Sequence, residues 1–127
     1  WIDYRLSNKN MSFRFEKLDV WKEARIIVKE IYMLTAKFPQ SETFGLVSQL
    51  RRAAVSILLN LAEGSNRNSD KEKIRFFEMS HTSVDEVVTG LYIALDLRYI
   101  TQENFDRLYE LLSKQAAKTV ALKNSLR

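Results

Sequence analysis

The chain has 127 residues, of which 46% are hydrophobic and 28% are charged, and its formal net charge is +4. This length and this apolar content fit one globular domain and exclude a wholly disordered chain, and the excess of basic residues is compatible with an anionic partner. Three glycines and one proline are too few for the tight turns of a β-rich fold, and the absence of cysteine excludes disulfides and thiol catalysis.

The first ten residues are polar and precede a methionine, so we interpret residues 1–10 as an upstream or non-native extension. Residues 11–127 then form a single domain. No segment approaches the length of a membrane span, and the lack of cysteine suits a cytoplasmic protein.

Two helices are predicted in the first half of the domain. The first runs from about Asp19, a good N-cap, to Phe38, where Pro39 stops it. The second covers roughly residues 44–63 and ends at Gly64, a residue type common in left-handed C-caps. In the first helix, apolar residues at three- and four-residue steps predict a buried stripe of Val20, Ala24, Ile27, Val28, Ile31, Leu34 and Phe38.

Two further helices are predicted in the second half. Ser69 and Glu72 form a capping-box pattern at the start of the third helix, which ends near Arg98, and Thr101 caps the fourth. Their apolar stripes are Ile74, Phe77, Val84, Val88, Leu91 and Leu95, and Phe105, Leu108, Leu112, Thr119, Leu122 and Leu126. Four amphipathic helices with short connections predict an all-α fold, an up-down-up-down antiparallel four-helix bundle.

Basic side chains form the outer faces of the first and last predicted helices, which are neighbours in an up-down bundle. The two faces can form one surface whose cations neutralise the phosphates of RNA or DNA, through Lys22, Arg25, Lys29, Arg107, Lys114 and Lys118. The third helix carries acidic residues instead, namely Glu78, Asp85 and Asp96, with Glu86 near them. Each charged stripe can equally be a solvated face, and no base-reading helix, zinc finger or aromatic single-strand platform is recognisable.

The second predicted helix is apolar around most of its circumference, because Val55 and Leu59 project from the side opposite its core stripe. A four-helix bundle leaves one side of each helix open, so we expect another copy of the chain to cover this side. The predicted subunit interface comprises Gln49, Arg52, Val55, Ser56, Leu59, Asn60 and Glu63. Alternatively, Val55 and Leu59 are scattered exposed apolar residues. Within the polar strip, Arg52 can pair with Glu63 or with Glu86.

No catalytic site is predicted. The one histidine, His81, lies at the margin of the third helix beside Ser80 and Ser83, and no nucleophile-elbow motif surrounds these serines. Without a second histidine or a cysteine, and without a glycine-rich phosphate loop, we expect no metal site and no cofactor. The sequence therefore favours a protein that is not an enzyme.

Two segments resemble a known family. The pattern FP-x-x-E-x-x-GL spans residues 38–46, and the pattern QLRRAA…S-x-x-x-N-x-AEG spans residues 49–64. In this combination the chain resembles the bacterial four-helix-bundle proteins encoded in intervening sequences of 23S ribosomal RNA genes. It is more distantly similar to the accessory variability proteins of diversity-generating retroelements. The matching positions are Trp21, Tyr32, Phe38, Pro39, Glu42, Gly45, Leu46, Gln49, Arg51, Arg52, Ser56, Asn60, Glu63, Gly64 and Arg67.

The resemblance implies a cytoplasmic homo-oligomer, typically a pentameric ring, and for the retroelement relatives binding to nucleic acid and to a reverse transcriptase. The chain departs from the family at Leu59, where proline is common, so any kink there is expected to be weaker. It departs again at Thr82-Ser83, because the family commonly has Gly-Ser at these two positions. The acidic residue that follows them in the family is Glu86 in this chain.

The resulting hypothesis is a non-enzymatic oligomeric scaffold that binds RNA or DNA through a basic surface. The alternative is a protein–protein interaction module without nucleic-acid binding. A helical toxin-like nuclease is a weaker third hypothesis.

Overall fold

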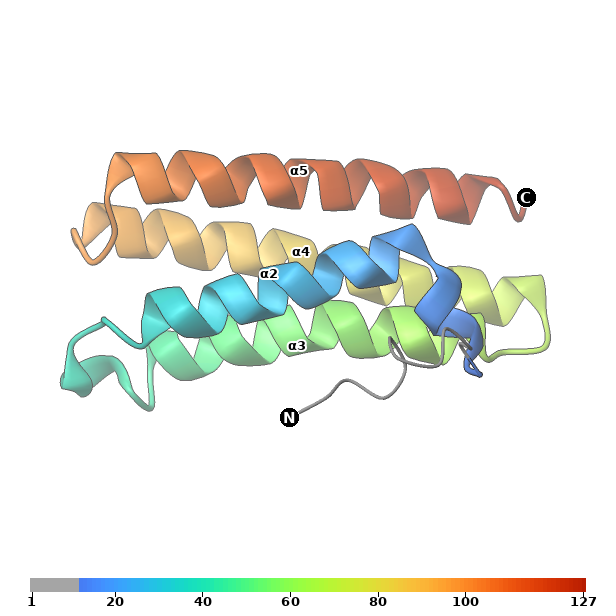
Figure 1. The fold of residues 1–127 in the computed structure, drawn as a ribbon, viewed down its shortest axis with the longest axis horizontal. Helices are drawn as coiled ribbons and strands as arrows, with labels where there is room; N and C mark the ends of the chain where they lie inside the picture. The colour runs from blue at the N-terminus through green and yellow to red at the C-terminus, as the bar shows by residue number, and fades with distance from the viewer. Residues whose placement is uncertain (1–11) are drawn as a thin grey trace.

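A computed structural model describes residues 12–127, so the predicted extension at residues 1–10 lies outside the described residues. Four long helices lie side by side and alternate in direction (Figure 1). They are α2 (Asp19–Thr35), α3 (Leu46–Ser65), α4 (Asp70–Asp96) and α5 (Gln102–Asn124), with short 3-10 helices η1 (Arg14–Lys17) and η2 (Gln40–Glu42). No strand occurs within residues 12–127. The all-α up-down-up-down antiparallel four-helix bundle is therefore confirmed.

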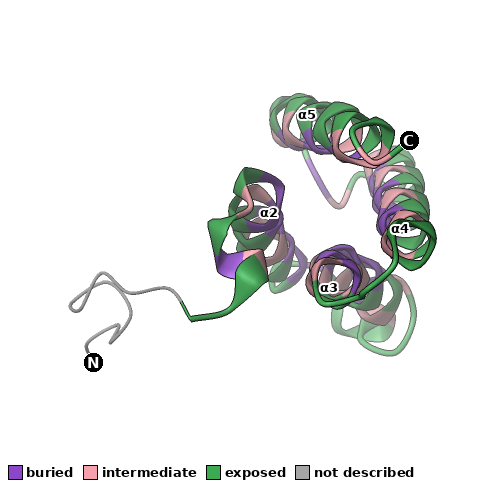
Figure 2. Ribbon diagram, turned by 90° about the vertical axis from the view of Figure 1, so that its right-hand side faces the viewer, coloured by how far each residue is buried: buried purple, intermediate pink, exposed green. Residues whose placement is uncertain are grey.

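The core lies along the axis of the bundle, where the buried faces of the four helices meet (Figure 2). Most of the predicted stripes are buried there, although Val28, Leu34, Ile74, Val88, Leu95, Leu122 and Leu126 are only partly buried. Thr119 is buried as its place in the predicted stripe indicates, and the apolar periodicity does not identify the other buried polar side chains, namely Glu16, Thr35, Ser80, Ser83 and Gln115. The hydroxyl of Thr119 donates to the carbonyl of Gln115 at 2.8 Å, as a buried hydroxyl on a helix commonly does.

Helix α2 differs from the prediction at both ends. Leu18 occupies the N-cap position without a side-chain cap, and Asp19 is the first helical residue, where its carboxylate still favours the positive end of the helix dipole. The helix ends at Thr35, three residues before the predicted Phe38. Pro39 disfavours helical dihedrals in the residue before it, so residues 36–38 form a turn instead.

Helix α3 is displaced toward the C-terminus relative to its predicted range. It begins at Leu46 and continues through Gly64 to Ser65. The predicted left-handed C-cap at Gly64 is wrong, because Gly64 is helical and no described glycine has a positive φ. A Cβ atom at Gly64 would lie 2.6 Å from Cε1 of Phe77, so this glycine permits close packing of α3 against α4.

The ends of α4 use two different caps. Ser69 accepts the backbone N–H of Glu72 at 3.2 Å, but the Glu72 carboxylate pairs with Arg75 and not with the cap backbone. At the C-terminus, Arg98 has a left-handed φ of 62°. Its N–H donates to the carbonyl of Leu95, and the N–H of Tyr99 donates to that of Ala94, which is a Schellman motif with arginine in the position usual for glycine.

The predicted cap of α5 is confirmed, since the Thr101 hydroxyl accepts the N–H of Asn104 at 3.1 Å.

Candidate functional site

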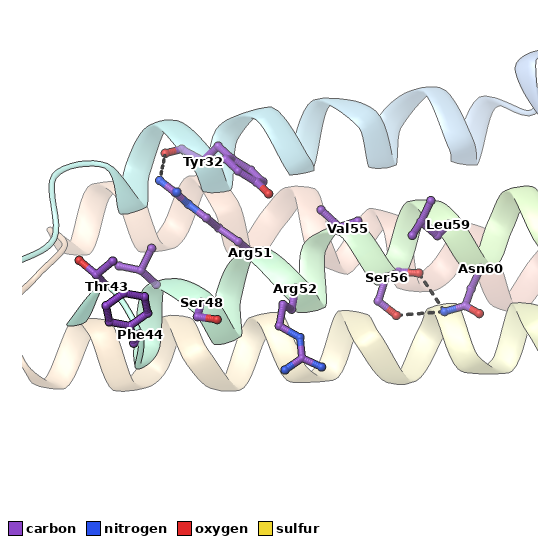
Figure 3. A pocket seen from close by; sticks show the side chains of 11 residues that line it. Tyr32, Thr43, Phe44, Ser48, Arg51, Arg52, Val55, Ser56, Leu59 and Asn60 are labelled. Atoms are coloured by element: carbon purple, nitrogen blue, oxygen red, sulfur yellow. Dashed lines mark hydrogen bonds between the residues drawn. The ribbon is translucent and has the colours of Figure 1, made fainter. Parts of the chain in front are cut away.

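An apolar groove of about 760 Å³ lies on the outer side of α3, between α2 and the connection that precedes α3 (Figure 3). Phe44 and Leu59, on this groove, are 96% and 59% exposed, whereas Val55 is partly buried. Leu59 thus projects into solvent, as predicted for this side of the helix. Phe44 is not among the predicted interface residues, because the predicted helix over residues 44–63 includes it. In the structure, Phe44 precedes α3, which begins at Leu46.

The connection between α2 and α3 holds Phe44 outward. The Glu42 carboxylate accepts the N–H of Leu46 at 3.2 Å and the hydroxyl of Tyr99 at 2.9 Å. Gly45 leaves room for this carboxylate, since a Cβ atom at Gly45 would lie 2.8 Å from Oε1 of Glu42. The FP-x-x-E-x-x-GL motif therefore acts as a folded connection, and Phe44, the residue before its glycine, is left in water.

The two adjacent arginines of α3 have different environments. Nε of Arg51 donates to the hydroxyl of Thr35 at 2.9 Å, and its guanidinium lies 4.5 Å from the centroid of the Tyr32 ring. Figure 3 shows Arg51 extending toward α2 and Arg52 pointing away from it. Within residues 12–127, Arg52 forms no ion pair. Arg51 is therefore committed to the fold, whereas Arg52 is available to a partner.

Most polar side chains of the strip along α3 form their hydrogen bonds and ion pairs within the chain. Nδ2 of Asn60 donates to the carbonyl and hydroxyl oxygens of Ser56 at 2.9 and 3.0 Å, and the Ser83 hydroxyl donates to that of Ser56 at 2.8 Å. Glu63 pairs with Arg67 at 2.8 Å, so neither proposed pairing of Arg52, with Glu63 or with Glu86, is present. Gln49 is exposed.

The departure at Thr82-Ser83 leaves the contact between α3 and α4 intact. Ser83 is buried and bonded to Ser56, while Thr82 is exposed and lines a groove between α3 and α4. Gly90 supplies a close approach in this contact, since a Cβ atom there would lie 2.5 Å from Cδ2 of Leu50.

The structure does not join the six predicted basic residues into one surface. Acidic residues of α2 face α5 and pair with its cations, Glu23 with Lys118 at 2.5 Å and Glu30 with Arg107 at 2.6 Å. Lys114 pairs within α5 with Glu110 at 3.4 Å. The α5 half of the predicted surface is therefore largely neutralised.

The α2 half keeps its charge exposed. Lys22 and Lys29 have no ion pair within residues 12–127, and Arg25 lies 6.0 Å from the centroid of the Trp21 ring. The three cations line a groove of about 650 Å³ that also includes apolar and aromatic side chains of Ile26, Val28, Tyr32 and Leu58.

The hydroxyls near the histidine are engaged in the fold. Ser80 donates to the carbonyl of Ile57 at 2.9 Å, and Nδ1 of His81 lies 4.0 Å from a carboxylate oxygen of Asp85. In the described part of the chain, no group of three or more His, Asp or Glu residues is arranged to hold a metal ion. None of the described helices combines the length and the apolar character needed to cross a membrane.

The chain matches a protein-family model and is similar to a solved structure. A family model described as 23S rRNA-intervening sequence protein matches residues 16–121. The chain is also similar to a crystal structure from Bacteroides thetaiotaomicron, described as a protein with unknown function from the S23 ribosomal protein family. That similarity has a TM-score of 0.74 at 17% identity and covers 82% of this chain and 97% of that one, which shows a shared fold. No curated protein matches the chain.

Proposed function

The chain belongs to the 23S rRNA-intervening sequence protein family, and on this premise we propose that it is a non-enzymatic scaffold that assembles with copies of itself. The observation that carries the proposal is the apolar groove on α3, where Phe44 is 96% exposed and Leu59 is 59% exposed. Covering a side chain of this size stabilises an assembly by ~1.5–3 kcal/mol. A contiguous apolar groove is typical of an interaction site, whereas single exposed apolar residues are not.

We further propose that the assembly is a closed homo-pentamer in the cytoplasm. The number five and the compartment rest on the family resemblance and on the absence of cysteine. A ring of five copies requires an interface between two different surfaces of the chain. The groove on α3 supplies one of these surfaces.

Oligomeric state tests the proposal directly. Native mass spectrometry and light scattering across a concentration series should show an assembly for the natural chain and dissociation for Leu59→Asp. Met33→Asp is the matched control, since Met33 is also apolar and 59% exposed but lies on α2 outside the groove. A natural chain that stays monomeric at the highest attainable concentration would refute self-association.

A second function is favoured by the exposed cations of α2, because Lys22 and Lys29 form no ion pair within residues 12–127. We propose that Lys22, Arg25 and Lys29 bind RNA or DNA through phosphate contacts, with Tyr32 beside them in the same groove. Arg107, Lys114 and Lys118 contribute less, because each already has a carboxylate partner. Affinity should fall with salt, with a slope of about −2 to −3 in log K against log salt for three phosphate contacts.

Fluorescence anisotropy with RNA and DNA of mixed sequence tests this function. The K22E/K29E double variant should lose binding, whereas Lys114→Glu should retain most of it. Absence of binding to any nucleic acid at low salt would instead favour the interaction module without nucleic acid. In that case a protein partner should be captured with or without nuclease treatment. A partner such as a reverse transcriptase is supported by the family resemblance alone.

A further inference from the structure

We infer that the second surface of the self-associating interface is the groove between α3 and α4, and that it receives Phe44 of the neighbouring copy. This inference rests on the proposed self-association and names the two surfaces that meet. Three observations support it: an exposed side chain, a groove of suitable size, and a cation beside the side chain with anions beside the groove.

Phe44 is presented as a preformed anchor. Glu42 holds the connection through the N–H of Leu46 and the hydroxyl of Tyr99, and Phe44 stays 96% exposed. A residue whose backbone is already held in place loses less conformational freedom on binding than one on a loose loop. Aromatic anchors of this kind carry much of the binding energy of protein interfaces.

The receiving groove lies on the other flank of α3 and has a volume of about 540 Å³. Leu46, Leu50 and Ile93 form its apolar lining, and Ile93 is 44% exposed. Gly90 also lines the groove, and its missing side chain lets Leu50 pack directly against α4 at the floor of the groove. Cavities of about 300–1,000 Å³ hold whole small ligands, so this groove has room for one phenyl ring.

Charge favours this pairing of surfaces. Arg52 lines the same groove as Phe44, and it has no ion-pair partner within residues 12–127. Asp85 and Glu86 line the receiving groove. Glu86 forms no ion pair in the described part of the chain, and the carboxylate of Asp85 has only His81 at 4.0 Å. A cation beside the anchor and anions beside the hollow orient one copy on the next.

The two surfaces lie on different sides of the same helix, because one groove extends toward α2 and the other toward α4. A copy that inserts Phe44 into its neighbour therefore leaves its own groove free for a third copy. Such a head-to-tail contact generates a ring when its rotation closes.

The first test removes the anchor. Phe44→Ala should weaken association by roughly 30-fold, as expected for an interface hot spot. Met33→Ala, a truncation of another exposed apolar side chain, should leave association unchanged. Circular dichroism should show the same helical content for both variants, because neither side chain belongs to the core.

The second test exchanges the charges. R52E and E86R should each weaken association by on the order of 10-fold, because each sets like charges against one another across the contact. The R52E/E86R double variant should regain association, since every contact of the ring, whatever its number of copies, then again sets a cation against an anion. Lys71→Glu, an equal change of charge on an exposed part of α4, should have no effect.

The outcomes separate this inference from the proposed function. If the natural chain assembles and Phe44→Ala assembles equally well, self-association stands and the assigned pair of surfaces is overturned. If R52E and E86R are each impaired but the R52E/E86R double variant stays dissociated, the pairing of Arg52 with the acidic groove is overturned. If Phe44→Ala abolishes capture of a different protein and leaves self-association intact, Phe44 serves that partner and the inference fails.

Discussion

The contact between α3 and α4 and the contact between α2 and α5 are closed by different interactions. Where α3 meets α4, Gly64 lies beneath the buried ring of Phe77, and the Ser80 hydroxyl bonds to the carbonyl of Ile57 at 2.9 Å. These groups are enclosed, so their size and polarity are tightly constrained.

Where α2 meets α5, two ion pairs join the exposed edges of the helices, Lys118 with Glu23 and Arg107 with Glu30. Beneath them, Nε2 of the buried Gln115 donates to the carbonyl of Val20 at 3.0 Å. Exposed ion pairs contribute ~0–1 kcal/mol each, so the edge of this contact tolerates substitution. Small, enclosed side chains thus constrain the first contact, whereas the edge of the second carries solvated charges that contribute little to stability.

The largest effect is expected from Phe77→Ala, which empties the contact between α3 and α4. Phe77 is 2% exposed, and truncation of a buried phenylalanine costs ~3–5 kcal/mol of unfolding free energy. Chemical denaturation followed by circular dichroism measures this loss. Met33→Ala on the exposed side of α2 is the control, and an equal loss in both variants would contradict the difference between buried and exposed sites.

A smaller loss is expected from Gly64→Ala. Alanine improves helix propensity by ~1 kcal/mol, but its Cβ would lie 2.6 Å from the Phe77 ring and 3.1 Å from Cβ of Phe76. Overpacking of this kind costs ~1–3 kcal/mol, so the net change should be destabilising. The adjacent Ser65→Ala serves as a control in the same denaturation series. A stabilised Gly64→Ala variant would show that the two helices separate easily.

Still smaller effects are expected where α2 meets α5. Lys118→Ala and Arg107→Ala should each change the unfolding free energy by ~0.5 kcal/mol or less, because their ion pairs are solvated. High salt should reduce even this difference. A loss of several kcal/mol in either variant would mean that the ion pairs hold this contact closed, contrary to the comparison.

The smallest effect concerns the hydrogen bond between Tyr99, which lies between α4 and α5, and Glu42, which lies between α2 and α3. The hydrogen bond that Tyr99 donates to the Glu42 carboxylate, together with burial and the nearby negative charge, raises the pKa of Tyr99 above its ordinary value of 10.0. A raised pKa means that the folded state retains this proton more strongly. The resulting stability is complete below the unfolded pKa and is lost as pH rises through the folded pKa.

Glu42→Gln should therefore return the pKa of Tyr99 toward its ordinary value. Phenolate absorbance during an alkaline titration measures the change, and Tyr99→Phe identifies this tyrosine among the five in the chain. An unchanged titration in Glu42→Gln would show that the hydrogen bond is absent in solution.

Much of the fold could be predicted from the sequence. Apolar spacing located the four helices, and Ser69 and Thr101 were correctly assigned as caps, because capping depends on groups within three residues. The same local reasoning failed at Gly64, where glycine is equally suited to a left-handed cap and to close packing. Only the position of Phe77 distinguishes the two.

The candidate site could be predicted less completely. Leu59 was placed on an open side of α3 from periodicity, but Phe44 was assigned to the helix because an isolated phenylalanine carries no sign of exposure. Glu23 and Glu30 lie on α2 beside the lysines, and the sequence alone does not show that they pair with cations of α5.

The amino-acid sequence by itself determined the helices, their order and the apolar side of each, because these depend on residues three or four positions apart. Only the tertiary structure decided which charges are neutralised and which aromatic side chain stays in water. Those outcomes depend on pairs such as Tyr99 and Glu42, 57 residues apart, and Lys118 and Glu23, 95 residues apart. No local pattern records such a distance, because the packing of whole helices brings these side chains together.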